Sequence, residues 1–229
     1  MNAGWIFSVL LMTLILDGMG RLCPAALLIF CIVLLCAESG KYLNLSHKPD
    51  IMEKIPHDPD EIVAVVDEKD RVIGQARRID VHKKGLLHRE VCVYVINPKK
   101  QVLLHRRADD HLWDHSCSGH FPKAQTYEEA ALREFEEELG VRLREHDFRE
   151  IGFERLKTVK SDRTNDKFVK IFLVRKDIPI SDFRIDKSEV EEIRYFDADG
   201  LKELLNDPDK VMKRSAKKII KEHILKEIE

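Results

Sequence analysis

The chain has 229 residues, of which 44% are apolar and 35% are charged, and its formal net charge is −2. This length suits one globular domain with additional segments, and it is ample for a core. The near-neutral charge provides no basic surface for general nucleic-acid binding, so we expect no nucleic-acid partner. The five cysteines are odd in number and form no C-x-x-C pair, which argues against a disulfide framework or a zinc site and favours a reducing, cytoplasmic compartment.

The first 40 residues differ in composition from the rest of the chain. They hold two apolar runs, at 5–16 and 22–37, each shorter than the roughly 20 residues that span a bilayer. No Lys or Arg precedes the first run, so a secretory signal is a poor match. Three interpretations stay open: a membrane anchor or hairpin that would tether the protein, an atypical signal sequence, and an extension upstream of a start at Met52. Residues 41–60 are expected to be a linker, and residues 61–229 a folded domain.

Beyond the linker, short apolar runs separated by turn residues predict strands, and two pairs of them predict hairpins. Residues 106–125 are expected to be a loop before a helix, and two further helices are expected at 200–205 and 211–227. A mixed sheet packed between helices follows, of the α/β (α+β) class. The expected strands are 62–66, 72–75, 91–96, 102–105, 149–156, 167–174 and 192–196.

A glutamate-rich segment has the signals of a short helix. Thr126 followed three residues later by Glu129 is a capping box, so the helix should begin at Tyr127 and end where Gly140 supplies a left-handed stop. At about 100° per residue, one stripe of this helix is apolar and a neighbouring arc is acidic. The apolar stripe is Ala131, Leu132, Phe135 and Leu139, and the acidic arc is Glu134, Glu137 and Glu138.

The acidic arc needs a physical reason, because like charges at i,i+3 and i,i+4 destabilise a helix by a few tenths of a kcal/mol per pair. Six glutamates lie between Glu128 and Glu138, against the single Arg133. A hard divalent cation would provide one, because Mg²⁺ takes oxygen ligands and often bridges to substrate phosphates. The alternative is a solvated acidic face.

The wider pattern resembles the Nudix box, G-x5-E-x7-R-E-U-x-E-E-x-G-U, where U is apolar. Gly119, the segment 133–138 and Gly140 followed by Val141 match its fixed positions, and Gln125 stands where the box has its first Glu. In the family that residue mainly supports the box arginine. The substitution would therefore exchange an ion pair to Arg133 for a neutral hydrogen bond, and it bears on loop rigidity more than on the metal site.

The resemblance covers about residues 60–229 and implies a Nudix-type α/β/α sandwich with a mixed sheet. It implies hydrolysis of a diphosphate linked to another group, with Mg²⁺, or Mn²⁺ as the alternative, held by Glu134, Glu137 and Glu138. One glutamate must accept a proton from the attacking water. Glu137 and Glu138 are candidates, and so is Glu189, because the segment 186–195 resembles the family loop that carries such an acid. The alternative for Glu189 is an exposed loop carboxylate.

Two consecutive arginines follow an expected strand. Arg106 and Arg107 are candidates to bind substrate phosphates, because a guanidinium makes bidentate phosphate contacts. A solvated turn is the alternative. Trp113 is expected to pack rather than to stack on a base. The substrate is expected to be a small diphosphate compound, and a homodimer is an open arrangement.

A branch of the same fold offers a second interpretation, because the segment 112–120 resembles type 1 isopentenyl-diphosphate isomerases. In those enzymes a catalytic Cys precedes the Gly-His pair, whereas this chain has Ser118 there, followed by Gly119 and His120. Their metal histidines map onto His88 and His120, and less securely onto His82, so His120 is a candidate site residue.

The isomerase acids, however, are not matched. The catalytic Tyr and two strand glutamates of those enzymes fall at Arg155, Asn165 and Lys167 in an ungapped alignment. A serine hydroxyl is a far poorer acid than a thiol. Hydrolysis therefore ranks above isomerisation, and a non-catalytic binding module, suggested by Gln125, ranks third.

Overall fold

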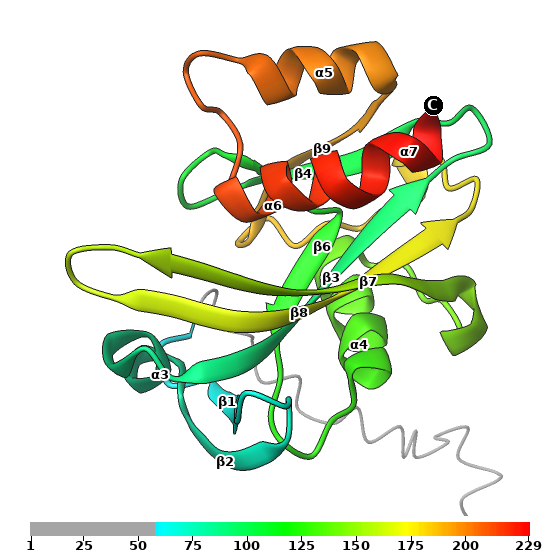
Figure 1. Ribbon diagram of the computed structural model, residues 1–229. Helices are drawn as coiled ribbons and strands as arrows, with labels where there is room; N and C mark the ends of the chain where they lie inside the picture. The colour runs from blue at the N-terminus through cyan, green and yellow to red at the C-terminus, as the bar shows by residue number, and fades with distance from the viewer. Residues whose placement is uncertain (1–57) are drawn as a thin grey trace, which may run out of the picture. The chain divides into compact units, whose positions relative to one another are not determined.

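The computed structural model describes residues 58–229 (Figure 1). The expectations for the apolar N-terminal runs and for most of the linker lie outside these residues. None of the helices between residues 58 and 229 combines the length and apolar character needed to span a bilayer.

Strand β3 (Leu87–Ile96) is the centre of one mixed sheet. One edge of β3 pairs in parallel with β8 (Thr164–Arg175) along its whole length. The other edge is shared by three antiparallel strands, which are β1 (Ile62–Val66), β6 (Cys117–His120) and β4 (Val102–Arg107). The outer strands are β2 (Val72–Arg77) on β1, β7 (Phe148–Val159) on β8, and β5 (Trp113–Asp114) and β9 (Val190–Phe196) on β4.

Helices cover both faces of the sheet (Figure 1). Helix α4 (Tyr127–Leu139) packs on the face that carries Val91, Val93 and Val95 of β3. Cys92, Tyr94 and Ile96 point the other way, because side chains alternate along a strand. That second face is covered by α5 (Ala198–Asn206) and by the C-terminal segments α6 (Arg214–Ile219), the π-helical turn η3 (Ile220–Ile224) and α7 (Leu225–Ile228).

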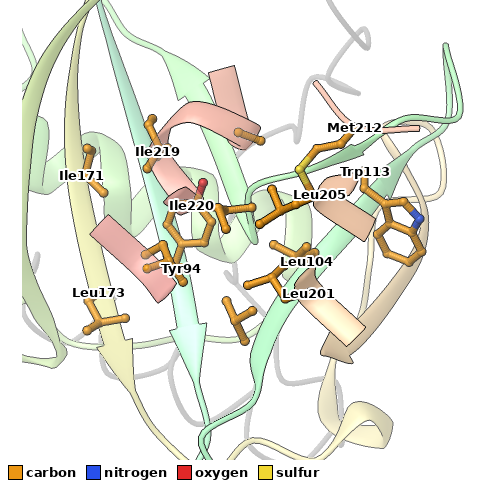
Figure 2. Packing of buried hydrophobic residues seen from close by; sticks show 14 of the residues in the cluster. Tyr94, Leu104, Trp113, Ile171, Leu173, Leu201, Leu205, Met212, Ile219 and Ile220 are labelled. Carbon is orange, nitrogen blue, oxygen red and sulfur yellow. The ribbon is translucent and has the colours of Figure 1, made fainter. Parts of the chain in front are cut away.

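The second face holds the larger apolar cluster, part of which is seen in Figure 2. Tyr94, Leu104 and Ile171 from the sheet meet Leu201 of α5 and Ile219 of α6 there, and all five are almost completely buried. Apolar side chains therefore cover both faces of β3. The α/β/α sandwich with a mixed sheet that the sequence predicts is confirmed.

Every expected strand and helix within the described residues is present, but the expected loop at 106–125 is wrong in part. It contains β5 and β6, and a helix that the sequence did not signal, α3 (Arg78–Lys84), follows β2 directly. Strand β6 reads Cys-Ser-Gly-His and forms because it pairs with β3 over four residues. The first residue before α3 is Arg77, whose side chain makes no capping hydrogen bond. The short 3₁₀ turns η1 (Glu145–Asp147) and η2 (Ile180–Asp182) complete the fold.

Candidate active site

Helix α4 carries the candidate catalytic residues, and its ends are those predicted. The Thr126 hydroxyl accepts from the Glu129 backbone N–H at 3.1 Å, and the Glu129 carboxylate accepts from the Thr126 N–H at 2.8 Å. Gly140 has φ 65°, the left-handed conformation that a glycine adopts without strain. The capping box and the glycine stop together fix which side chains of α4 face the sheet.

Two of the three box glutamates are buried. Glu134 and Glu138 expose only 2% and 3% of their surface, whereas the side chain of Glu137 is 36% exposed. Glu134 lies against Gly119 of β6 so closely that a Cβ at Gly119 would be 2.1 Å from the carboxyl carbon. Taking ionised carboxylates out of water is costly unless a cation accompanies them. This acidic arc is therefore partly interior, and the solvated face considered above describes Glu137 alone.

Arg133 is the cation that the structure supplies to this arc. Its guanidinium donates to Glu137 at 2.9 Å, to Glu134 at 2.7 Å and to the carbonyl oxygen of His120 at 3.0 Å. Its Nε also donates to the Gln125 side-chain oxygen at 3.3 Å. The neutral hydrogen bond expected from Gln125 is confirmed. Arg133 therefore ties the loop before α4 to two of the three carboxylates.

Glu138 faces a histidine that does not neutralise it. The Nδ1 atom of His105 lies 3.7 Å from the Glu138 carboxylate and 3.1 Å from the Ser116 carbonyl oxygen. Burial lowers the pKa of His105, so its imidazole is neutral at neutral pH. His105 therefore adds no positive charge beside the Glu138 carboxylate.

The donor set of Glu134, Glu137 and Glu138 fits a hard divalent cation in kind, because all its ligand atoms are carboxylate oxygens. Only two sets of side chains within residues 58–229 bring three ligand atoms within 4.8 Å of one another, and this triad is not one of them. Arg133 holds an oxygen of two members of the triad. To bind a cation, Glu134 and Glu137 would therefore have to give up part of their contact with Arg133.

Glu189 lies on a segment attached to the C-terminal end of α4. The backbone N–H groups of Arg184 and Asp186 donate to the carbonyls of Leu139 and Glu138 at 2.9 and 3.0 Å. The Glu189 carbonyl accepts from Ala108, just after β4, at 2.9 Å. Glu189 is partly buried rather than exposed. These bonds fix its backbone next to the helix that carries the box.

The two candidate phosphate-binding arginines end strand β4, and both already have acidic partners. Arg106 pairs with Glu191 and Glu192 at 3.0 and 3.1 Å, and Arg107 pairs with Asp109 at 2.9 Å. Trp113 is 7% exposed and meets Phe196 edge to face at a centroid distance of 4.9 Å. Its expected packing role is confirmed.

Three histidines gather at a separate place, although they come from α3, β3 and β6. The ligand nitrogens of His82, His88 and His120 lie within 4.8 Å of one another. Their Nε2 atoms are buried without hydrogen-bond partners in the described part of the chain. Burial lowers the pKa values of His82 and His88 to about 4 and that of His120 well below its ordinary value, so all three are neutral near pH 7.

The histidine cluster and the carboxylates lie on opposite faces of the sheet. Gly119 of β6 faces Glu134 of α4, and the next residue, His120, points away from that helix because side chains alternate. His120 therefore meets the box through its backbone carbonyl, which binds Arg133. Its side chain belongs to the other face.

A buried ion pair borders the histidine cluster. Lys167 of β8 sits opposite His88 in the register and pairs with Glu90, which also lies 3.5 Å from His120 Nε2. The ammonium stands where the isomerase resemblance expects an acid. The Lys167–Glu90 pair was not predicted, because a lysine in a strand gives no signal of burial.

Comparison with known proteins identifies the family of the chain. The model of the NUDIX domain matches residues 86–216. The chain belongs to the Nudix family. The matched residues include all of α4 and β6, and therefore the whole motif from Gly119 to Val141.

Relatives of this Nudix chain include hydrolases and isomerases. It is 44% identical over 95 residues to an uncharacterized Nudix hydrolase of Streptomyces coelicolor, covering 39% of this chain and 52% of that protein. It is 41% identical over 86 residues to isopentenyl-diphosphate Delta-isomerase 2 of Photorhabdus laumondii, covering 35% and 49%. The chain thus spans about half the length of these relatives. The resemblance to the isomerase-like branch is confirmed.

Longer matches support the fold. An uncharacterized Nudix hydrolase of Pseudomonas aeruginosa is 30% identical over 146 residues, which are 59% of this chain and 78% of that protein. The crystal structure of a Deinococcus radiodurans protein superposes with a TM-score of 0.54 at 21% identity, over 70% of this chain and 97% of that one. The second comparison shows the fold alone.

Proposed function

We propose that the protein is a Mg²⁺-dependent Nudix pyrophosphohydrolase that cleaves a small organic diphosphate. The observation that carries the proposal is the burial of Glu134 and Glu138, one helical turn apart, beside a glycine that leaves room for a carboxylate. Two buried like charges at i,i+4 destabilise an isolated helix. A divalent cation shared with a polyanionic substrate would compensate these two negative charges.

In this proposal Glu134, Glu137 and Glu138 hold the cation, with Mn²⁺ as the alternative to Mg²⁺. When bound, such a cation neutralises phosphate oxygens and lowers the pKa of a bound water. Arg133 acts as a positioning residue, because its contacts to Glu134, Glu137 and the His120 carbonyl orient the helix against the loop. Gln125 supports Arg133 through a neutral hydrogen bond.

The proton of the attacking water needs an acceptor, and Glu189 is one candidate. The attachment of its segment to the end of α4 supports this role. Glu137 and Glu138 remain the rival bases. Arg106 and Arg107 are proposed to bind substrate phosphates, and each would exchange a carboxylate partner for a phosphate.

Isomerisation of an isoprenoid diphosphate is the second candidate, and the three-histidine cluster is the observation that favours it. The residues around the cluster weigh against it. Ser118 replaces the acidic thiol, and Lys167 brings an ammonium beside His88 where a carboxylate ligand would be required. A non-catalytic binding module is the third candidate.

An assay with nucleoside and isoprenoid diphosphates plus Mg²⁺ tests the ranking. We expect release of phosphate or a monophosphate, and Glu137→Gln should lower turnover by about 100-fold or more while the fold is kept. Glu136→Gln is the matched control, because Glu136 is exposed on the same helix and pairs only with Arg142 among the described residues. Its turnover should stay within about twofold.

Three results would change the ranking. Full activity of Glu137→Gln would remove the metal assignment. Interconversion of isopentenyl and dimethylallyl diphosphates without phosphate release would place isomerisation first. Activity that appears only in Gln125→Glu would identify the natural chain as a binding module.

A further inference from the structure

A cavity of about 310 Å³ lies between the β7–β8 hairpin and the start of the C-terminal helix. Its volume is near the lower end of the range of small-molecule sites, roughly 300 to 1,000 Å³. No Asp or Glu is among the described residues that line it. Among its polar side chains are Thr158, Asn165, Lys167, Arg214, Ser215 and Lys218.

The cavity lies on the face of the sheet opposite α4. Side chains alternate along β8, so Lys167 points to the same face as Val169 and Ile171. Val169 and Ile171 pack beneath the C-terminal segments α6, η3 and α7. Lys218 binds Glu154, a residue of β7, from the helix side at 2.9 Å. The cavity is therefore separate from the box glutamates, which lie on α4 at the other face of the sheet.

Two further cations border the cavity, and both bind carboxylates outside it. Arg155 and Lys157 bind the buried carboxylate of Asp166 at 3.0 and 2.9 Å. Arg155 also pairs with Glu68. Their charges are therefore already matched.

Of the remaining cations, Lys167 and Lys218 form ion pairs, and Arg214 forms none within residues 58–229. Lys167 pairs with Glu90, and both side chains are almost buried, with 9% and 8% exposed. A lysine ammonium has three donors, and this contact uses one of them. Arg214 is exposed at the rim and forms no ion pair within residues 58–229. The rim thus carries an unmatched guanidinium, which suits planar phosphate oxygens.

The neutral groups of the cavity can also bind an anion. The hydroxyls of Thr158 and Ser215 donate hydrogen bonds. The side-chain oxygen of Asn165 is buried and has no hydrogen-bond partner in the described part of the chain. A buried amide end without a partner calls for a ligand group, because such atoms are otherwise satisfied. A 180° flip of the amide would present its two N–H donors.

We infer that this cavity binds a phosphate group of a small molecule, at a site separate from the box carboxylates. Arg214, two hydroxyls, an amide and the ammonium groups of Lys167 and Lys218, which also bind Glu90 and Glu154, line a space without a lining acid. The site is additional to the proposed hydrolysis, and its binding test does not depend on that activity. The phosphate belongs either to the distal end of the enzyme's own substrate or to a separate effector.

Calorimetry with inorganic pyrophosphate tests the site. The full chain carrying Glu137→Gln, measured in EDTA, should bind one pyrophosphate. Arg214→Glu should weaken binding at least about tenfold, because it removes a charge-assisted contact. Ser215→Ala should weaken it by about two- to tenfold, the range for a neutral hydrogen bond. Lys221→Glu is the matched control, because Lys221 is an exposed residue of the same helix outside the cavity, and it should change affinity less than about twofold.

Absence of pyrophosphate binding would overturn the inference. Equal losses in Arg214→Glu and Lys221→Glu would also overturn it, because they would show general charge attraction only. Kinetics of Arg214→Glu in the otherwise natural chain then separate the two sources. A raised KM at unchanged kcat assigns the phosphate to the substrate, and unchanged constants assign it to an effector. Failure to find a hydrolysable substrate leaves the binding measurement intact.

Discussion

Gly119→Ala tests the contact between β6 and the box helix directly. The added Cβ would lie 2.1 Å from both Cδ and Oε1 of Glu134 and 2.6 Å from Oε2. Because such contacts are far below van der Waals distance, the carboxylate or the strand must move. Glu134 is only 2% exposed, so its side chain has little space to turn into. The substitution therefore displaces a proposed metal ligand without removing its charge.

Gly119→Ala should lower both the free energy of unfolding and the catalytic rate. Overpacking a filled interior costs about 1–3 kcal/mol in the free energy of unfolding. For a domain of this size each kcal/mol lowers the melting temperature by about 2–4 °C, so the variant should melt roughly 2–12 °C below the natural chain. A catalytic group displaced by about 1 Å can lose about 100-fold in rate. Mg²⁺ affinity should fall with the rate.

Thermal melting, urea denaturation, Mg²⁺ titration and turnover assays measure these effects. Gly74→Ala is the control, because a Cβ at Gly74 of β2 meets nothing within 4 Å, and its stability should change by at most about 0.5 kcal/mol. Natural stability and Mg²⁺ affinity in Gly119→Ala would refute the close packing of Glu134. Loss of stability with natural Mg²⁺ affinity would refute Glu134 as a ligand.

Three further changes have defined outcomes. Gln125→Glu should raise the free energy of unfolding by up to about 1 kcal/mol in low salt, because a carboxylate then faces Arg133, and no gain would place the side chain away from the guanidinium. Trp113→Ala should cost about 3–5 kcal/mol in urea denaturation, and a large KM change without that loss would contradict its packing role. Burial lowers the pKa of His88 from 6.5 to about 4, so below pH 6.5 the unfolded chain takes up the proton first and stability falls down to about pH 4, by about 3 kcal/mol. In EDTA, His88→Gln should make this pH slope shallower, and an unchanged slope would contradict the burial of a neutral His88.

The predictions that proved accurate rested on signals within a single element or motif. Helix α4 begins and ends where the capping box and Gly140 place it, because both signals act within the helix itself. The Gln125–Arg133 hydrogen bond was also expected, because the Nudix resemblance places Gln125 where the family has the residue that supports the box arginine. Strand β6 was missed because its four residues have no apolar alternation, and it exists only through its pairing with β3.

Long-range contacts explain what could not be predicted of the site. Glu90 and Lys167 are 77 residues apart, and their pairing depends on the parallel register of β3 and β8. His82 approaches His88 and His120 because α3 follows β2 without a linker, and no signal in the sequence marked α3 as a helix. The histidines could be suspected from the isomerase resemblance, but their neutral, buried state could not.

Side chains alternate along β6, so the carboxylates of α4 and the histidine cluster lie on opposite faces of the sheet and can change independently. Cys117 and Gly119 face α4, and Ser118 and His120 face the other side, because neighbouring residues of a strand point in opposite directions. The face toward α4 keeps the acidic residues of the box. Ser118, Asn165 and Lys167, three of the four departures from the isomerase pattern, belong to the other face, which also carries the cation-lined cavity. Substitutions there can remove isomerase chemistry and alter ligand choice while the carboxylates on α4 keep the packing that the proposed hydrolysis requires.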